Sequence, residues 1–436
     1  MLKYKTAALI MGFIMLFSLP CAAAPELSVP SAVLVDASSG LVLFDKNKDA
    51  RVYPASTTKI MTAIIAIEHS EGRLSDMFTA SYAAVNSISF DSSKANLLEG
   101  EQMSYHDLIF ALLIASANDA ANVLAENIAG SSEEFVKLMN EKAAELGAAS
   151  THFQNPHGLH DENHYTTPAD MAKIARCAMT LPLFKEAVSS REYTIPATNM
   201  QPERNLVSTN QLLSRSSKYY YEYAKGIKTG YTTEAGYCLV SAAETSDRQL
   251  IAAVFGADPK AEEMFSFVDS KKLLSYGINT LKSSVIASKG DILSSVPLRN
   301  SYADDAILEA SETISVVLPE GADPSAVTKN ITLNKNISAP IEAGEVLGTV
   351  EFLYGGTPIA SCSLAAVSQY KKMPLAFIFR PVYKIIKAIG VYVIAAFAVI
   401  LLLLISAEKK RRAKIRRRKM REARRKEDME KMRRIK

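Results

Sequence analysis

The pattern of hydrophobic and polar positions divides the main part of the chain into strands at both ends and helices between them. Residues 31–36 and 40–44 have the composition of two strands joined by a turn, and further strands are predicted at 226–232, 237–243 and 249–256. Apolar residues recur at helical spacing elsewhere, at 56–68, 105–126, 133–146, from Thr167 onward, and at 261–276. This order predicts an α/β (α+β) domain in which helices cover one antiparallel sheet.

The pattern changes after residue 290. Short strand candidates at 313–318, 330–333, 346–354 and 358–364 are separated by Pro, Gly and Asn, and Gly355-Gly356 has the composition of a hairpin turn. Residues 290–368 are therefore predicted to form a small all-β domain, and residues 369–387 a linker.

Residues 1–24 have the three parts of a secretory signal peptide. Lys3 and Lys5 precede an uncharged run from Ala7 to Pro20, and small residues follow it. The run is short for a membrane span, which argues against an uncleaved anchor. Pro20 and the absence of Leu at the third position before Cys21 argue against lipidation of that cysteine.

Residues 388–407 form an uncharged, apolar segment near the C-terminus. Its length suits a transmembrane helix, because 1.5 Å per residue carries it across a hydrocarbon core of about 30 Å. The tail that follows, 408–436, holds 17 Lys and Arg against 5 Asp and Glu, and such charge cannot sit beside a buried core helix. We therefore expect a cytoplasmic tail and an extracytoplasmic body. The tail's charge would also suit nucleic-acid binding, but the adjacent span favours stop-transfer and attraction to anionic lipid.

The net charge of +4 conceals an acidic body, because residues 25–387 contain 31 basic and 41 acidic side chains. An acidic body argues against broad binding of phosphate backbones, so no nucleic-acid partner is expected. Outside the signal peptide the cysteines are Cys177, Cys238 and Cys362, an odd number, and no structural disulfide is predicted. Since no CxxC or HExxH pattern occurs, the sequence predicts neither a metal site nor a cofactor.

The first candidate for chemistry is Ser56-Thr57-Thr58-Lys59, which stands at the start of a predicted helix. A spacing of three places the Ser56 hydroxyl and the Lys59 ammonium on one helix face. A Ser hydroxyl needs a base to become a nucleophile, and a buried Lys can be that base if its pKa falls. Taken alone, however, an S-x-x-K match is usually ordinary helix surface.

Two further motifs strengthen the hypothesis. Ser116-Ala117-Asn118 interrupts an apolar stretch, and Lys228-Thr229-Gly230 lies on a predicted strand. Alone, the first could be a helix cap and the second a polar edge strand. The order S-x-x-K, S-x-N, K-T-G is the set associated with penicillin-binding proteins and class A β-lactamases.

With these motifs the sequence resembles the low-molecular-mass penicillin-binding proteins, the serine-type D-alanyl-D-alanine carboxypeptidases of peptidase family S11. The resemblance spans about residues 30–368 and includes Asn155-Pro156-His157-Gly158-Leu159 and the S-K-K-L-L-S-Y-G segment at 270–277. It implies a β-lactamase/transpeptidase-like catalytic domain at 25–282, followed by the family's β-rich C-terminal domain.

The resemblance also implies roles for the matching residues. Ser56 would form the acyl-enzyme with Lys59 as its base, and Ser116 would relay the proton to the departing D-alanine. Five residues would bind the substrate: Asn118, Lys228, Thr229, Gly230 and Tyr231. Asn118 would hold the peptide amide, Lys228 would supply positive potential, and Thr229 would bond the terminal carboxylate. The backbone N–H groups of Ser56 and Tyr231 would form the oxyanion hole.

Two absences bear on the reaction type. No convincing E-x-x-L-N motif is present for the deacylating Glu of class A β-lactamases, so rapid β-lactam hydrolysis is disfavoured. Family members usually carry an Arg just before the K-K-L-L segment, which helps to grip the terminal carboxylate; residues 264–270 contain none, and Lys260 is the candidate substitute. His157, in the family's H-G-L turn, is expected to be structural, and His160 and His164 are expected to be loop residues.

We therefore expect a single-pass membrane protein whose extracytoplasmic domain removes the terminal D-Ala from peptidoglycan stem peptides and is inhibited covalently by β-lactams. The missing Arg and the long tail leave two alternatives open: a catalytically weak penicillin-binding scaffold and a DD-endopeptidase. A β-lactamase is the weakest alternative.

Overall fold

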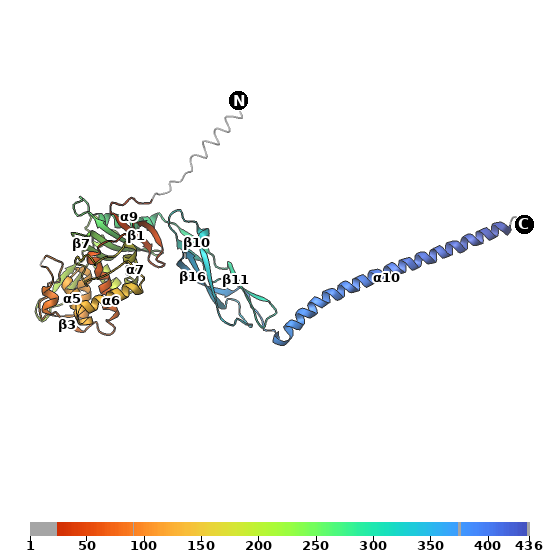
Figure 1. Ribbon diagram of the computed structural model, residues 1–436, viewed down its shortest axis with the longest axis horizontal. Coiled ribbons are helices and arrows are strands. Elements are labelled where there is room, and N and C mark those ends of the chain that lie inside the picture. Colours follow the sequence, from red (N-terminus) through yellow and green to blue (C-terminus); the bar gives the residue numbers. More distant parts are fainter. Residues whose placement is uncertain (1–23, 90, 374–375, 434–436) are drawn as a thin grey trace, which may run out of the picture. The chain divides into compact units, whose positions relative to one another are not determined.

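The computed structural model describes residues 24–89, 91–373 and 376–433 (Figure 1). The signal-peptide prediction, with Cys21, lies outside these residues except for Ala24. The chain divides into two compact units, one containing residues up to Lys289 with 312–332 and 349–362, and the other containing 290–311, 333–348 and the chain from Ser363.

A five-stranded antiparallel sheet forms the centre of the first unit, in the order β2-β1-β9-β8-β7. Its strands are Ser31–Asp36 (β1), Val42–Lys46 (β2), Ala224–Thr232 (β7), Gly236–Glu244 (β8) and Gln249–Ala257 (β9). The predicted sheet is confirmed, and β2 lies two residues later than the sequence indicated. Because the chain leaves the sheet after β2 and returns only at β7, the two ends of the domain meet in one sheet.

The segment between β2 and β7 supplies most of the helices. These are η1 (Ala55–Thr58), α2 (Lys59–Glu68), α3 (Tyr82–Asn86), α4 (Tyr105–Ile114), α5 (Asn118–Ala129), α6 (Ser132–Glu145), α7 (Pro168–Ala178), α8 (Pro182–Ser189) and η2 (Gln211–Leu213), followed after β9 by α9 (Phe265–Asn279). Two small ribbons lie among them, β3–β4 (Met77–Thr79 with Gln102–Ser104) and β5–β6 (Glu192–Ile195 with Arg204–Val207). The sequence did not predict either ribbon, α3 or α8.

Both faces of the central sheet are buried, as the alternation of side chains along a strand requires. Val33 and Val35 of β1 belong to the core that contains α2, α4 and α5. Leu34 points the other way, toward α9. A Cβ on Gly277 of that helix would lie 2.5 Å from Leu250 Cδ1 and 3.0 Å from Leu34 Cδ2, so glycine allows α9 to approach the sheet.

The helix predicted over 105–126 is two helices. α4 ends at Ile114 and α5 begins at Asn118, and Ser116 between them has φ +61°, in the left-handed region. The prediction of one helix was wrong because apolar residues stand on both sides of the break, and the short polar interruption at Ser116 and Asn118 was not taken as a helix end. The consequence is functional, since Ser116 stands in a strained connection instead of on a helix face.

The C-terminal β region contains a sheet in the order β11-β12-β16-β15-β14 and a separate pair, β10-β13. Its strands are Ser283–Ala287 (β10), Ile292–Pro297 (β11), Asp305–Ala310 (β12), Ile314–Val317 (β13), Thr328–Leu333 (β14), Val346–Tyr354 (β15) and Thr357–Ala366 (β16), with the short η3 at Pro324–Ala326. The predicted hairpin is confirmed: Gly355 and Gly356 connect β15 to β16 with φ of +56° and +83°, the left-handed conformations that a tight hairpin turn needs.

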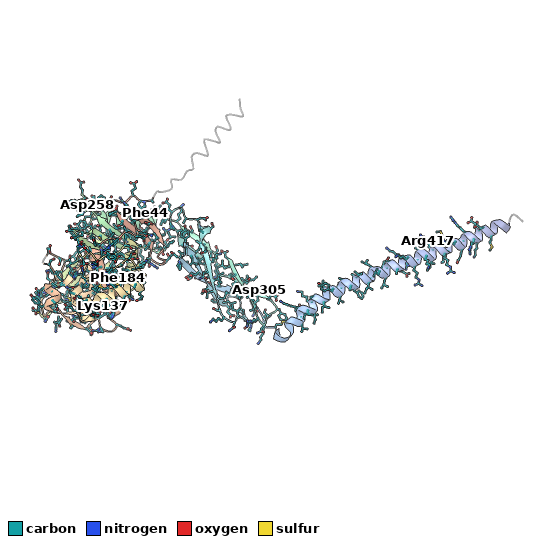
Figure 2. The ribbon with its side chains drawn as sticks, in the orientation of Figure 1. Phe44, Lys137, Phe184, Asp258, Asp305 and Arg417 are labelled. Carbon is teal, nitrogen blue, oxygen red and sulfur yellow. The ribbon has the colours of Figure 1, made fainter. Side chains whose placement is uncertain are left out.

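The described chain ends in one long helix, α10 (Ala376–Arg433), which contains the apolar segment and most of the basic tail. Residues 382–429 include a window of mean hydropathy 3.0, long and apolar enough to cross a membrane. Their side chains are almost all exposed, and Figure 2 shows them projecting from the helix, Arg417 among them. An apolar helix whose side chains are exposed fits a membrane anchor.

Candidate active site

Ser56 lies in the 3-10 turn that leads into α2, where the chain is held in an unusual conformation. Ala55 has φ +48°, which a residue with a Cβ rarely adopts. The Ser56 side chain is only half-buried and lines a cavity, whereas Thr57, Thr58 and Lys59 after it are buried. The turn therefore presents one hydroxyl to the cavity and packs its neighbours inside.

Lys59 is completely buried, and its amine has three partners. The distance from Lys59 Nζ to Ser56 Oγ is 2.9 Å. The same nitrogen donates to Asn118 Oδ1 at 2.5 Å and to the carbonyl oxygen of His157 at 2.6 Å. Burial, followed by the nearby charge of Lys228, holds the pKa of Lys59 well below its ordinary value, while Asp119 opposes the shift.

These contacts suit a neutral amine. A neutral Lys has two N–H groups and one lone pair, and two of its three neighbours here, an amide oxygen and a carbonyl, can only accept. When both N–H groups are donated to them, the lone pair is left for the Ser56 hydroxyl. The geometry can therefore hold a base against a nucleophile.

Ser116 and Asn118 come from the break between α4 and α5. Ser116 is 4% exposed and lines the cavity, and Asn118 is the first residue of α5. The break is fixed from two sides, because Asn118 N donates to Ser93 O at 2.9 Å and the carboxylate of Asp119 accepts from Ala95 N and Leu97 N at 2.9 Å each. The predicted S-x-N pair is thus brought beside S-x-x-K.

Strand β7 forms the opposite wall and carries the K-T-G motif. Lys228 is 1% exposed; its Nζ donates to the Thr229 carbonyl at 3.1 Å, and burial lowers its pKa to about 7. Gly230 is needed where the strand passes the nucleophile, since a Cβ there would lie 3.1 Å from Ser56 N, Ala55 Cβ and Pro54 O. The Thr229 and Tyr231 side chains face the cavity on either side of this glycine.

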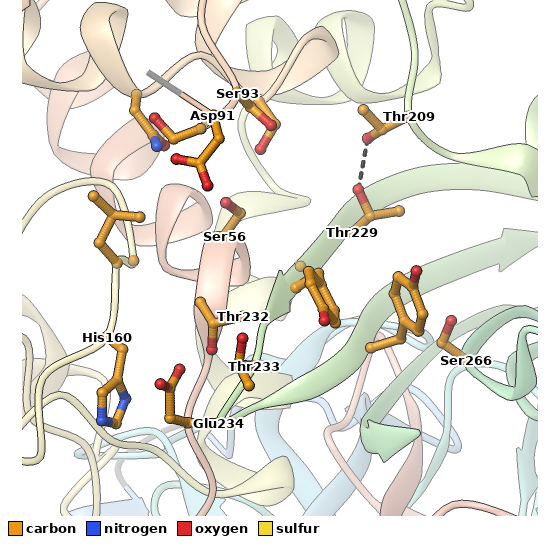
Figure 3. Close-up of a pocket in the computed structure, with 18 of the residues that line it drawn as sticks. Ser56, Asp91, Ser93, His160, Thr209, Thr229, Thr232, Thr233, Glu234 and Ser266 are labelled. Atoms are coloured by element: carbon orange, nitrogen blue, oxygen red, sulfur yellow. Dashed lines mark hydrogen bonds between the residues drawn. The ribbon is translucent and has the colours of Figure 1, made fainter. Parts of the chain in front are cut away.

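All three motifs therefore meet at one cavity of about 540 Å³. Figure 3 shows Ser56 near its centre, with Thr209, Thr229 and Ser266 on the right of the view and His160 and Glu234 on the left. Ten of the 22 lining residues are Ser or Thr, and the described lining contains no Lys or Arg. Lys260, the candidate substitute for the missing Arg, is exposed and outside this lining. Groups of three or more His, Cys, Asp or Glu able to hold a metal do not occur in the described chain, and no disulfide joins the cysteines within it.

The H-G-L turn is hydrogen-bonded to α2, the helix that follows the nucleophile. Besides the Lys59–His157 contact, Thr62 Oγ1 donates to Pro156 O at 2.5 Å. Gly158 has φ +90°, and a Cβ there would lie 1.9 Å from Ala55 O, so only glycine fits. His157 Nδ1 accepts from Leu159 N at 3.2 Å, and burial lowers the His157 pKa to about 3. These contacts are those of a neutral, loop-bonded histidine, as the sequence suggested.

His164 was expected to be only a loop residue, but it is 2% exposed and bonded at both ring nitrogens. Nδ1 accepts from Gln154 N at 3.1 Å, and Nε2 lies 2.7 Å from Thr58 Oγ1. The first bond assigns the proton to Nε2, which donates to Thr58. Burial lowers the pKa of His164 to about 3, so this neutral side chain ties the loop to the turn that carries Ser56.

Sequence motifs did not reveal several residues that line the cavity. Ser93 and Asp91 precede α4 by more than ten residues, Thr209 precedes η2, and Ser266 lies in the first turn of α9. Thr209 Oγ1 and Thr229 Oγ1 are 2.6 Å apart (Figure 3, dashed line). Ser266 lies within residues 264–270, and the absence of an Arg there was the one signal in the sequence that pointed to this segment. For Asp91, Ser93 and Thr209 only the folded chain shows that they line the cavity.

Comparison with known proteins agrees with the motifs. Residues 20–259 match the model of the family described as D-alanyl-D-alanine carboxypeptidase, Peptidase S11. The chain belongs to this carboxypeptidase family. The predicted family and transpeptidase-like fold are confirmed, and the chain is a D-alanyl-D-alanine carboxypeptidase of the serine type.

Relatives resemble this carboxypeptidase over most of their length. The D-alanyl-D-alanine carboxypeptidase DacF of Bacillus subtilis is 35% identical over 345 residues, covering 78% of this chain and 86% of the relative. DacC of Escherichia coli is 34% identical, covering 77% and 82%. Penicillin binding protein 5 of Haemophilus influenzae has a similar structure, with a TM-score of 0.62 and 32% identity, covering 80% of this chain and 100% of that one.

The second region of this carboxypeptidase matches a family model as well. Residues 282–372 match the C-terminal domain of penicillin-binding protein 5. The predicted β-rich C-terminal domain is therefore confirmed as a fold. The long apolar helix α10, which follows this match, is consistent with membrane anchoring.

Proposed function

We propose that this carboxypeptidase cleaves the terminal D-alanyl-D-alanine bond of peptidoglycan stem peptides through an ester on Ser56, and that β-lactams acylate the same hydroxyl. The observation that carries the proposal is the setting of Lys59. A buried amine 2.9 Å from Ser56 Oγ, with two fixed acceptors for its N–H groups, is what an activated serine requires.

In acylation, Lys59 takes the Ser56 proton as Oγ attacks the penultimate D-alanyl carbonyl. The oxygen of that carbonyl gains negative charge and is stabilised by the backbone N–H groups of Ser56 and Tyr231. The close passage of β7 at Gly230 supports this pairing, because it brings the strand within contact of Ser56 N. Ser116, whose hydroxyl lines the cavity, relays the proton to the leaving nitrogen.

The substrate lies along β7. Asn118 accepts from Lys59 through its oxygen, so its amide nitrogen is available to the acyl part of the peptide. Lys228 supplies positive potential from beneath the strand, and Thr229 donates to the terminal group. Water then attacks the ester, the proton returns to Ser56, and the shortened peptide leaves.

The membrane arrangement follows from α10 and its charge. We infer that residues 1–24 are removed on export, that 25–282 and 290–368 act outside the cytoplasm with 369–387 as their connection, and that 388–407 span the membrane. The basic residues of 408–436 stay on the cytoplasmic side, where Lys and Arg are retained. Single cysteines placed in the tail of the full chain should be labelled by impermeant maleimide only after the membrane is opened.

The nucleophile assignment is tested by Ser56→Ala in the full-length protein in detergent. The variant should lose covalent labelling by fluorescent penicillin and release of D-alanine from a pentapeptide, while its melting temperature stays near that of the parent. Labelling that persists at the parental level would reject Ser56.

Two other functions remain as alternatives, and the cavity gives a reason for considering them. Its described lining contains no cation for a terminal carboxylate, which fits either a slow penicillin-binding scaffold or an endopeptidase. D-alanine release at about 1 s⁻¹ or faster, within the ordinary enzymatic range, would exclude the scaffold. The endopeptidase alternative differs from the carboxypeptidase in the leaving group, which continues as peptide instead of ending at D-alanine.

A further inference from the structure

The end of the cavity that receives the leaving group is built from hydroxyls. With Ser56 and Tyr231 at the scissile carbonyl, the residue that departs lies toward Thr229, and Thr209 and Ser266 are on the same side of Ser56 in Figure 3. Thr209 and Thr229 are bonded to each other at 2.6 Å, which uses one of their two protons and leaves one to donate. Ser266 is 2% exposed, and its hydroxyl makes no hydrogen bond to any described residue.

Cations do not reach this end of the cavity from the described chain. Lys59 and Lys228 are buried beneath its lining, and Lys260 lies outside it. The Lys228 amine is turned to the Thr229 carbonyl, and burial lowers its pKa to about 7.

The titratable groups that do line the cavity add negative charge. Asp91 and Glu234 are both exposed side chains of the lining, and His160 lines the cavity as well. No described residue forms an ion pair or hydrogen bond with Glu234. Asp91 accepts from Ser89 Oγ at 2.8 Å, which leaves its charge in place. An anionic terminus therefore enters a cavity whose lining contains hydroxyl donors and two carboxyl groups of the same sign of charge as the terminus.

We propose that this site binds its leaving group through neutral hydrogen bonds, so that it also cleaves D-alanyl bonds whose leaving residue is carboxamidated or continues as peptide, and that Ser266 is the residue that sets this tolerance. The inference rests on the proposed acyl-enzyme mechanism. A hydroxyl can donate to a carboxylate or to an amide oxygen, and it carries no charge of its own with which to select the carboxylate. A guanidinium favours the carboxylate more strongly, through its charge and a bidentate fit.

The chemistry is the same for both kinds of substrate. The Ser56 oxygen forms an ester with the D-alanyl carbonyl, the C–N bond to the leaving residue breaks, and that nitrogen receives the proton that Lys59 took from Ser56. The leaving product is D-alanine, D-alaninamide or a peptide amine. Water then hydrolyses the ester, so no further reactant is needed.

The test compares diacetyl-L-lysyl-D-alanyl-D-alanine with its C-terminal amide on the full-length protein. The kcat/KM values for acid and amide should agree within about fivefold in the parent. In Ser266→Arg the acid should be preferred by roughly tenfold to hundredfold, the effect of one hydrogen bond to a charged group. Ser266→Gln, of similar length without charge, is the matched control and should leave the ratio near the parental value.

Penicillins provide a second readout. The acylation rate of benzylpenicillin, which is anionic, relative to its neutral methyl ester should rise in Ser266→Arg and not in Ser266→Gln. A parent that prefers the acid substrate by more than a hundredfold would overturn the inference and leave the proposed function standing. Failure of the parent to hydrolyse either peptide would instead reject the proposed function, and with it the inference.

Discussion

The two ends of the active-site cavity are built on different principles. At the nucleophile end, two lysines are buried beneath the lining, and Lys59 has an assigned partner for every proton. At the leaving-group end the three hydroxyl side chains are uncharged. Thr209 is exposed, Thr229 is half-buried, and the buried Ser266 has no hydrogen-bond partner in the described chain. The comparison indicates that buried hydrogen bonds hold the nucleophile and its base in place. The leaving group, in contrast, is selected by a few contacts that a single substitution can change.

The largest effect is expected from Lys59→Met, which breaks the rigid end. Met has a similar length and no base, so acylation by fluorescent penicillin should slow by about 10²-fold to 10⁴-fold, the range for removal of a general base. Stopped-flow labelling measures the rate, and a melting curve shows whether the variant is folded. Acylation within tenfold of the parent in a folded Lys59→Met protein would show that another group accepts the Ser56 proton.

Motifs could single out the residues of the rigid end because these residues are close in sequence or lie on long elements. Ser56 and Lys59 are three residues apart, in η1 and at the start of α2, and Lys228 and Thr229 lie on a strand whose pattern is clear. The sheet and these residues therefore followed from local signals. Ser116 was singled out by its motif, but the positive φ that exposes it was not predictable, since a strained break is imposed by the surrounding contacts of Asn118 and Asp119.

The leaving-group end was largely invisible in the sequence. Thr209 is 20 residues before Thr229, and Ser266 is 37 residues after it, on an element that reaches the cavity only because α9 packs on β8 and β9. Single hydroxyls carry no spacing signal. Sequence reasoning could note that an Arg was missing but could not say which group occupies its place. Local sequence signals could not predict the pairing of β1 with β9 either, because the two strands lie far apart in the sequence.

A smaller and more specific effect is expected from Lys228→Met, which tests whether the two buried lysines are coupled. The positive charge of Lys228 lowers the Lys59 pKa, so its removal raises that pKa and moves the acidic limb of the acylation profile to higher pH. The rate should fall most below about pH 7, where Lys228 is charged in the parent, and recover in part at high pH.

The measurement for Lys228→Met is the penicillin acylation rate between pH 5 and pH 10, with Lys225→Met as the matched control, because Lys225 is an exposed lysine earlier on the same strand. A uniform loss of rate at every pH would mean that Lys228 acts on the substrate or the fold and not on Lys59.

The smallest effect is expected from Thr209→Val, which removes one hydroxyl of the leaving-group end at nearly constant shape. Thr209 and Thr229 share one internal hydrogen bond, so the substitution leaves one donor, on Thr229, but no longer fixes its direction. We expect kcat/KM to fall about twofold to fivefold, less than the loss of a direct hydrogen bond, and by the same factor for the acid and the amide substrate. Thr233→Val, at the other end of the cavity, is the control. A loss confined to the acid substrate would mean that Thr209 recognises the carboxylate itself, and the contrast between a charged and an uncharged end would then have to be redrawn.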